Sequence, residues 1–146
     1  MGFRFGGESY TVPQDEMIAF AEKWDPRPIH LDDAAGLEAG FGGVIASGAY
    51  TTAVFTQLSV RSHTKSGDQA ILAGLGAKLR LRRVRAGDTL TYSGEITDRR
   101  ESKSLPHAGI VETHAVLTNQ HGETAYESTT TTLVLKRPEA RQEASP

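Results

Sequence analysis

The chain has 146 residues, a length that fits one domain with a hydrophobic core of its own. With 38% hydrophobic residues, 23% charged residues and a formal net charge of −2, its composition is that of a globular domain and excludes collagen, coiled-coil and disordered classes. The near-neutral charge gives no support for a nucleic-acid or anionic-membrane partner. The absence of cysteine excludes disulfides, thiolate nucleophiles and thiolate metal sites.

Hydropathy and histidine spacing exclude further classes of site. No apolar run approaches the ~20 residues of a membrane span, and the amino end lacks the apolar region of a signal peptide. We therefore expect a cytoplasmic protein with no membrane partner. The five histidines show no metal-ligand spacing, so no metal site is expected.

A first helix is expected to end at Trp24, after a short alternating start. Thr11-x-x-Gln14 has the form of a capping box at its beginning. Helical spacing predicts one buried face, formed by Met17, Phe20 or Ala21, and Trp24. The two prolines of Asp25-Pro-Arg-Pro-Ile-His30 prevent the helix from continuing, so the chain should turn at Asp25.

A second helical turn is expected over residues 31–39, then a glycine loop over 40–43, then a longer helix over 46–61. Apolar residues surround the axis of the longer helix and leave it hardly any polar face. This pattern indicates a central helix that is enclosed by other structure.

The second half of the chain alternates apolar and polar residues with the period of two that is typical of strands. Leu75, Ala77, Leu79 and Leu81 give the clearest case and predict a half-buried strand. Turns at 87–88 and 119–122 complete a prediction of four strands in meander order. The strands are expected over about 69–82, 89–97, 111–117 and from 123 to near 135.

The order of these elements predicts the fold class. Helices followed by strands, with an apolar helix between them, indicate an α+β domain in which an antiparallel sheet curls around that helix. We expect residues 1–137 to form this single domain and residues 138–146 to be a flexible tail.

A carboxylate and an imidazole stand five positions apart at Asp25 and His30. The stiff, proline-containing stretch between them can hold the two side chains at a fixed separation, as general acid-base catalysis requires. From spacing alone an alternative stays open, in which Asp25 caps a turn and His30 donates to a backbone carbonyl.

The stretch Gly43-Val-Ile-Ala-Ser-Gly48 leads into the amino end of the longer helix. Free N–H groups at such an end can bind a carbonyl oxygen that becomes an oxyanion, and Gly48 has no Cβ to obstruct a substrate. The alternative here is that Ser47 serves only as an ordinary N-cap.

Three segments together resemble the MaoC-like dehydratases, relatives of the (R)-specific enoyl-CoA hydratases. They are Phe20-Ala-Glu-Lys-Trp-Asp-Pro-Arg-Pro-Ile-His-Leu-Asp32, Gly40-Phe-Gly-Gly-Val-Ile-Ala-Ser-Gly48 and Val84-Arg-Ala-Gly-Asp-Thr-Leu90. The resemblance extends from about residue 10 to 136. It implies the hot-dog fold, a curved antiparallel sheet around one long helix, and homodimers whose sheets pair edge to edge.

The resemblance also implies a reaction and its catalytic residues. In this family an aspartate and a histidine hold the water that adds across the double bond of a trans-2-enoyl thioester, giving an (R)-3-hydroxyacyl thioester. By position, Asp25 and His30 would hold this water here. Our own hypothesis for the division of roles, which the sequence does not settle, is that Asp25 takes the water proton while His30 orients the water and helps relay a proton to the α-carbon. The N–H of Gly48 would bind the thioester oxygen. Coenzyme A would be part of the substrate, with no metal or redox cofactor.

Two residues depart from the family pattern. Arg27 stands where hydratase relatives often have asparagine, which changes the charge beside the site. Thr56 stands where they have a serine that hydrogen-bonds the active pair. It can do the same, and the alternative is that it is simply a buried threonine. Ser47 and Tyr50 are further candidates for substrate contact, Tyr50 equally for the core. A basic run could contact coenzyme A phosphates or serve solubility: Arg80, Arg82, Arg83 and Arg85.

Two other functions stay open. A hot-dog thioesterase would bind the thioester carbonyl at the same helix end while an activated water releases the thiol. An acyl-thioester-binding subunit would keep the fold without turnover. The spacing of Asp25 and His30 argues against the first, and the intact set of Asp25, His30 and Gly48 against the second.

Overall fold

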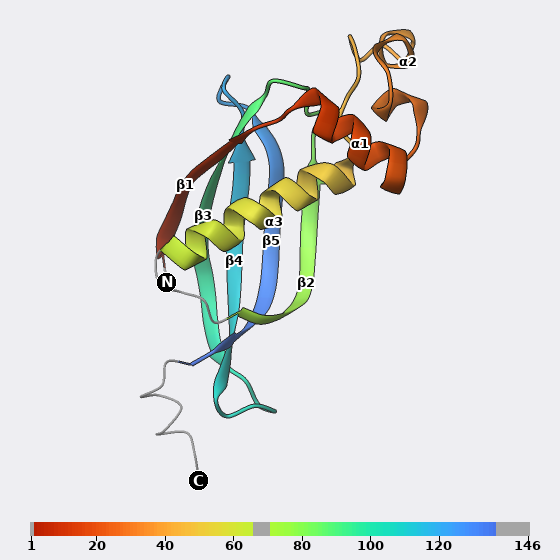
Figure 1. Ribbon diagram of the computed structural model, residues 1–146. Helices are drawn as coiled ribbons and strands as arrows, with labels where there is room; N and C mark the ends of the chain where they lie inside the picture. The colour runs from red at the N-terminus through yellow and green to blue at the C-terminus, as the bar shows by residue number, and fades with distance from the viewer. Residues whose placement is uncertain (1, 66–70, 137–146) are drawn as a thin grey trace.

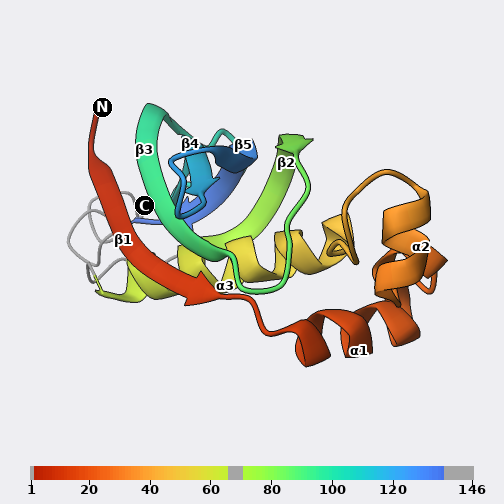
Figure 2. The ribbon, with the colours of Figure 1, turned by 90° about the horizontal axis from the view of Figure 1, so that it is seen from above.

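A computed structural model describes residues 2–65 and 71–136. Its elements are β1 Arg4–Thr11, α1 Gln14–Trp24, η1 Pro28–His30, α2 Asp33–Glu38, α3 Gly48–Lys65, β2 Ile71–Leu81, β3 Thr89–Glu101, β4 Ala108–Thr118 and β5 Thr124–Leu135. The strands form one antiparallel sheet, and α3 lies in its concave side (Figures 1 and 2). The predicted α+β class is therefore confirmed, while the predicted tail over 138–146 lies outside the described residues.

The predicted meander is right for only three of the four strands. The sheet order is β1-β3-β4-β5-β2, so β2 pairs with β5 and not with β3. Gly87-Asp88 therefore belongs to a connection that crosses from one side of the sheet to the other. Hydrogen bonds of Val12 with the backbone of Gly87 and Asp88 hold this connection against the end of β1, which is a fifth strand. Alternation predicts strands but does not say which ones pair.

The predicted capping box of α1 does not form. Thr11 is the last residue of β1, and its hydroxyl is bonded to the hydroxyl of Thr89 at 2.8 Å. The N-cap is instead Pro13, which makes no side-chain cap bond. Local spacing predicted that Thr11 would cap the helix, but its hydroxyl instead bonds to Thr89 of the neighbouring strand.

The end of α1 is where the sequence predicts it. The helix stops at Trp24, and the N–H of Asp25 closes it by donating to the carbonyl of Ala21. Met17 and Ala21 are fully buried, but Trp24, predicted to share their face, is 65% exposed. The helix thus delivers Asp25 at a fixed point beside the start of α3.

The long helix α3 is covered on one face only. Val54, Phe55 and Leu58 are buried toward the sheet, whereas Ala49, Ala53, Thr56 and Val60 on the opposite side are exposed. Tyr50 is buried against α1. Figures 1 and 2 show the sheet on one side of α3, and α1 beside the amino end of α3 on the other side, with the rest of that side uncovered within the described chain. The prediction of a helix enclosed on all sides is therefore wrong for the single chain.

Aromatic side chains join α3 to the sheet. The ring of Phe55 lies 4.5 Å from that of Tyr126 and 5.4 Å from that of Tyr92, centroid to centroid. Both tyrosines are 1% exposed. Burial of one large apolar side chain stabilises a fold by roughly 1.5–3 kcal/mol, so this cluster fixes the position of α3 on the sheet.

The edge strand β2 is poorly covered. Leu75, Leu79 and Leu81 are 53%, 45% and 43% exposed, because α3 packs against β1, β3 and β5. The prediction of a half-buried strand is thus wrong for one copy of the chain. Within the part of the chain that the structure describes, the outer edge of β2 also has no partner strand.

Candidate active site

The turn after α1 brings Asp25 and His30 together. Asp25 is the C-cap of α1, and His30 ends the short helix η1, which begins at Pro28. Nε2 of His30 lies 3.5 Å from Oδ2 of Asp25. The histidine side chain is 5% exposed and the aspartate side chain 16%. The two residues that the sequence singled out therefore lie side by side at the edge of the core, and this candidate pair is called the acid-base pair below.

The other ring nitrogen of His30 fixes its tautomer. Nδ1 lies 2.9 Å from the carbonyl oxygen of Ile45, in a buried contact. A carbonyl only accepts hydrogen bonds, so Nδ1 carries the hydrogen, and Nε2 holds the lone pair of the neutral ring. His30 thus makes both contacts that the sequence suggested. Its Nδ1 donates to a backbone carbonyl, and its Nε2 faces Asp25.

Arg27 and Ser47 bind the carboxylate of Asp25. Arg27 donates from Nε to Oδ1 at 2.7 Å and from its terminal nitrogen to Oδ2 at 2.8 Å, and Ser47 Oγ donates to Oδ2 at 2.7 Å. These bonds, first those from Arg27, hold the pKa of Asp25 well below its ordinary value. The carboxylate is therefore ionised through the neutral and mildly acidic range.

Ser47 connects this carboxylate to the start of α3. Its side chain is fully buried, and its oxygen accepts from the N–H of Ala49 at 3.2 Å while donating to Asp25. Ser47 thus has two roles. It caps the amino end of α3, as the alternative from the sequence proposed, and it also binds Asp25. Gly48 follows as the first, exposed residue of α3, where helix geometry leaves the N–H without an intrahelical acceptor.

A wide basin opens beside the pair. Its volume of about 780 Å³ lies within the roughly 300–1,000 Å³ of small-molecule sites. His30, Gly48 and Arg27 line it, whereas Asp25 does not. The connection after β2 supplies much of the remaining charged lining, namely Arg82, Arg83, Arg85 and Asp88.

Thr56 does not join this site within the chain. It lies exposed two turns along α3, and its hydroxyl donates to the carbonyl of Thr52 at 2.9 Å. The resemblance implied that Thr56 would hydrogen-bond the acid-base pair. Within this chain it does not.

Tyr50 lies in the core and does not line the basin. Its side chain is 3% exposed, and its hydroxyl donates to Oε1 of Glu16 at 2.6 Å. Burial, followed by this bond to Glu16, raises the pKa of Tyr50. The residue ties α1 to α3, the two helices whose facing ends carry the acid-base pair and Gly48.

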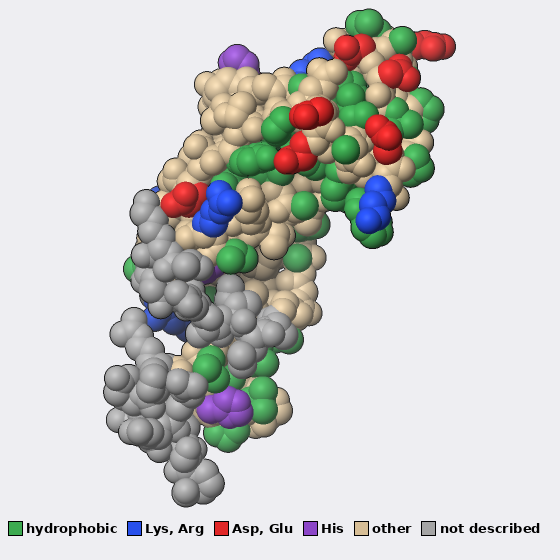
Figure 3. Space-filling view, viewed as in Figure 1, with side chains coloured by type: hydrophobic (Ala, Val, Ile, Leu, Met, Phe, Trp, Pro, Cys, Tyr) green, Lys and Arg blue, Asp and Glu red, His purple; other side chains and the backbone are tan. Residues whose placement is uncertain are grey.

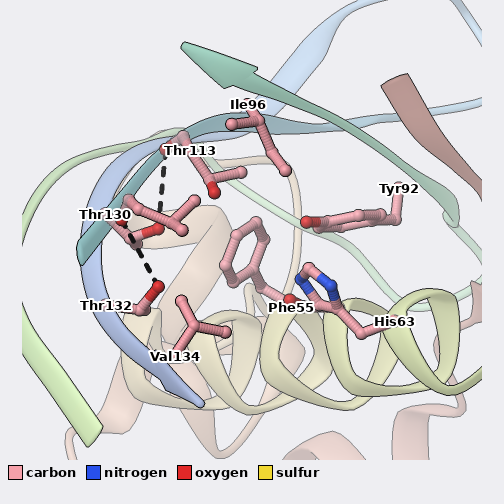
Figure 4. Close-up of a pocket in the computed structure, with 10 residues that line it drawn as sticks. Phe55, His63, Tyr92, Ile96, Thr113, Thr130, Thr132 and Val134 are labelled. Atoms are coloured by element: carbon pink, nitrogen blue, oxygen red, sulfur yellow. Dashed lines mark hydrogen bonds between the residues drawn. The ribbon is translucent and has the colours of Figure 1, made fainter. Parts of the chain in front are cut away.

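A smaller cavity lies beneath the second half of α3, and no sequence signal pointed to it. Phe55, His63, Tyr92 and Val134 point into this hollow from the helix and the sheet (Figure 4). Its volume is about 130 Å³, below the range of sites for complete ligands. Its lining comes from α3, β3, β4 and β5, a set that no sequence spacing could indicate.

The described residues form neither a cluster of metal ligands nor a membrane-spanning helix. Over 2–65 and 71–136, no group of three or more histidine or acidic side chains is arranged to hold a metal ion. In the same ranges, no helix is long and apolar enough to cross a membrane.

Known proteins share this sequence and fold. The family described as FAS1-like, dehydratase domain region, matches residues 1–128. The uncharacterized protein YdeM of Bacillus subtilis (strain 168) is 32% identical over 74 residues, which are 51% of each chain. The present chain therefore spans about half the length of that relative.

Two solved structures are similar over almost the whole chain. A MaoC-like dehydratase from Rhodospirillum rubrum is 35% identical with a TM-score of 0.86, over 94% of both chains. An (R)-hydratase from A. caviae involved in PHA biosynthesis is 26% identical with a TM-score of 0.65, over 93% of this chain and 96% of that one. On the family match and the 35% identity, the chain belongs to the FAS1-like dehydratase family and has the hot-dog fold of the MaoC-like dehydratases.

Proposed function

We propose that the protein is a hydro-lyase that adds water to a trans-2-enoyl-CoA to give an (R)-3-hydroxyacyl-CoA, or catalyses the reverse dehydration. The observation that carries the proposal is the acid-base pair of Asp25 and His30 beside the amino end of α3, at the rim of a ligand-sized basin. The similarity to an (R)-hydratase supports this choice of reaction.

The chemistry needs a base, a proton donor and a site for negative charge. The acid-base pair takes a proton from a water whose oxygen bonds to the β-carbon, and the electrons of the double bond move toward the thioester oxygen. The N–H of Gly48 donates to that oxygen at the positive end of α3. The proton then passes to the α-carbon. Every step is acid-base chemistry, so we propose no metal or redox cofactor.

The arginines of the basin suit the carrier of the acyl group. Arg82, Arg83 and Arg85 line it, and guanidinium groups bind phosphates in a bidentate manner. We propose that the phosphates of coenzyme A lie on this side. Asp88 and Glu123 also line the basin, so the arginines outnumber the carboxylates there without excluding them. On the face that Figure 3 shows, acidic side chains gather over α1 and α2, a surface that repels phosphates.

A second copy of the chain is proposed to cover β2. Leu75, Leu79 and Leu81 are exposed on an edge strand, and Leu81 also lines the basin. Pairing of two β2 edges would bury these leucines and place the partner at the rim of the basin.

The experiment follows two readouts with short and medium-chain trans-2-enoyl-CoA. Loss of the conjugated enoyl-thioester absorbance reports hydration, and a free-thiol assay reports hydrolysis. We expect absorbance loss without thiol release, abolished in Asp25→Asn. The control is Asp98→Asn, which removes an exposed aspartate that also pairs with an arginine, and it should retain activity.

Other outcomes separate the alternatives. Thiol release would identify a thioesterase. Silence in both assays from a folded protein would contradict the hydro-lyase proposal and favour an acyl-thioester-binding subunit.

A further inference from the structure

We infer that Arg27 is a positioning residue that commits Asp25 to holding the site together and leaves Nε2 of His30 to take the proton from water. The inference rests on the proposed function, because it assigns roles within the same site. It differs from our hypothesis from the sequence, in which Asp25 takes that proton.

Hydrogen bonds occupy most of the Asp25 carboxylate. A carboxylate offers about four lone-pair positions, two on each oxygen. Oδ2 accepts from Arg27 and from Ser47, and Oδ1 accepts from Arg27. The oxygen that faces His30 is Oδ2, whose two positions are both filled. A proton arriving there would have to displace a charge-assisted bond.

His30 presents the opposite situation. Its Nδ1–H is held by the carbonyl of Ile45, so the neutral ring keeps an unshared pair on Nε2. The described structure gives Nε2 no contact closer than the 3.5 Å to Asp25. This nitrogen is therefore an oriented base with a free lone pair.

The basin places a substrate on the side of the histidine. His30 and Gly48 both line it, so a thioester whose oxygen lies at Gly48 has its carbon chain on the side of the imidazole. Asp25 does not line the basin, and the residue that does is its partner Arg27, whose side chain is 68% exposed. His30 is thus the residue of the pair that faces the substrate, and Asp25 is the residue that orients His30.

The step balances with the histidine as the only proton carrier. One O–H bond of water breaks, its proton goes to Nε2 of His30, and the oxygen bonds to the β-carbon. The electron pair of the double bond moves to the α-carbon and the thioester oxygen, where Gly48 donates. The Nε2 proton then forms the new bond at the α-carbon, and the ring is neutral again.

Arg27 has the largest influence on the pKa of Asp25. The charged or titratable groups that act on Asp25 are Arg27 and His30, and Ser47 adds a neutral donor from the start of α3. Replacement of Arg27 by glutamine removes the largest of these influences. The pKa of Asp25 should then rise toward the ordinary range of a carboxyl, because an adjacent opposite charge is lost.

The first measurement needs no substrate. The Asp25 carboxyl carbon is followed by NMR against pH in protein labelled at aspartate, for the wild type, Arg27→Gln, Arg27→Lys and Arg100→Gln. Arg100 pairs with Asp98 two residues away, as Arg27 does with Asp25, and is the matched control. We expect no titration of Asp25 between pH 4 and 8 in the wild type and the control. Titration moves upward in Arg27→Gln and by less in Arg27→Lys.

The second measurement assigns the base. In hydration by the wild type, we expect an acid limb of kcat/KM that lies well above the low pKa at which Arg27 holds Asp25. A carboxylate base held at a low pKa by Arg27 would keep the rate level to below pH 4. Nitrogen-15 shifts should show Nε2 of His30 as the unprotonated nitrogen of the neutral ring.

Each outcome decides one part. An acid limb below pH 4, or an Asp25 titration that Arg27→Gln leaves unchanged, would overturn the inference. A wild type that hydrates no enoyl thioester would refute the proposed function and the proton-accepting role with it. The carboxyl titration would still test the holding role of Arg27 in that case.

Discussion

Asp25 and His30 share one water in the proposed reaction, so their substitutions should not act independently. We expect Asp25→Asn and His30→Ala each to lower kcat/KM by about 10²- to 10⁴-fold, because one removes a group that orients the water and the base, and the other removes the base itself. The double variant should lose little more than the worse single variant, because residues that act as a unit fail together. Steady-state kinetics of the four proteins measures this. Losses that multiply would contradict a shared water.

The lowered pKa of Asp25 also makes a prediction about stability. A carboxyl whose pKa is lower folded than unfolded stabilises the protein above its unfolded value of 3.8, and this contribution is lost as pH falls through the folded value. The wild type should therefore lose stability relative to Asp25→Asn as pH falls below about 4. Urea unfolding at pH 7, 4 and 3 measures it. An equal difference at all three values would show that Asp25 does not titrate differently on folding.

At the scale of elements, the site depends on how α1 is held against α3. Tyr50 of α3 and Tyr10 of β1 both donate to Oε1 of Glu16, at 2.6 and 2.7 Å. Only the bond from Tyr50 joins the two helices whose ends carry the site.

We therefore expect Tyr50→Phe to lower the free energy of unfolding by about 1 kcal/mol, the usual net worth of a hydrogen bond. It should also reduce kcat, because Asp25 at the end of α1 loses its alignment with Ser47. Tyr10→Phe is the matched control, since it removes the exposed bond to the same oxygen. Urea unfolding and kinetics compare them, and equal effects on kcat would argue against the tether.

Local sequence signals predicted the elements better than their arrangement. The prolines after Trp24 fixed the end of α1, and the periodicity of α3 and of the strands gave the fold class. The capping box failed because Thr11 has a strand partner 78 residues away. The position of β2 failed for the same kind of reason, since strand order depends on contacts that alternation does not encode.

The site residues show the same contrast between local features, which the sequence predicts, and distant contacts, which it does not. Asp25 and His30 are brought together by a short stiff stretch, and Ser47 with Gly48 by a helix start, all of which are local features. Thr56 was assigned by position in a family pattern, and its own chain turns it away from the pair. The carbonyl of Ile45 that orients His30 has no side-chain signature at all.

At the scale of the whole molecule, β2 tests the proposed pairing of two copies. A lysine at an exposed leucine of the edge strand would place a charge in the interface. We expect Leu79→Lys to convert a dimer to a monomer in light scattering and to weaken activity, because Leu81 of the same strand lines the basin. Leu37→Lys, at a 59% exposed leucine of α2, is the control and should leave the mass unchanged. A wild-type monomer would contradict the pairing.

The uncovered edge of β2 should make the stability of this protein depend on its concentration. If another molecule supplies the cover of the leucines, mass action sets the fraction of chains that lack it, and the midpoint of thermal unfolding should rise with total concentration. A chain left alone keeps a row of unsatisfied backbone groups beside apolar side chains, which can template pairing with any extended segment. The strand that completes the assembly is thus also where misassembly would begin.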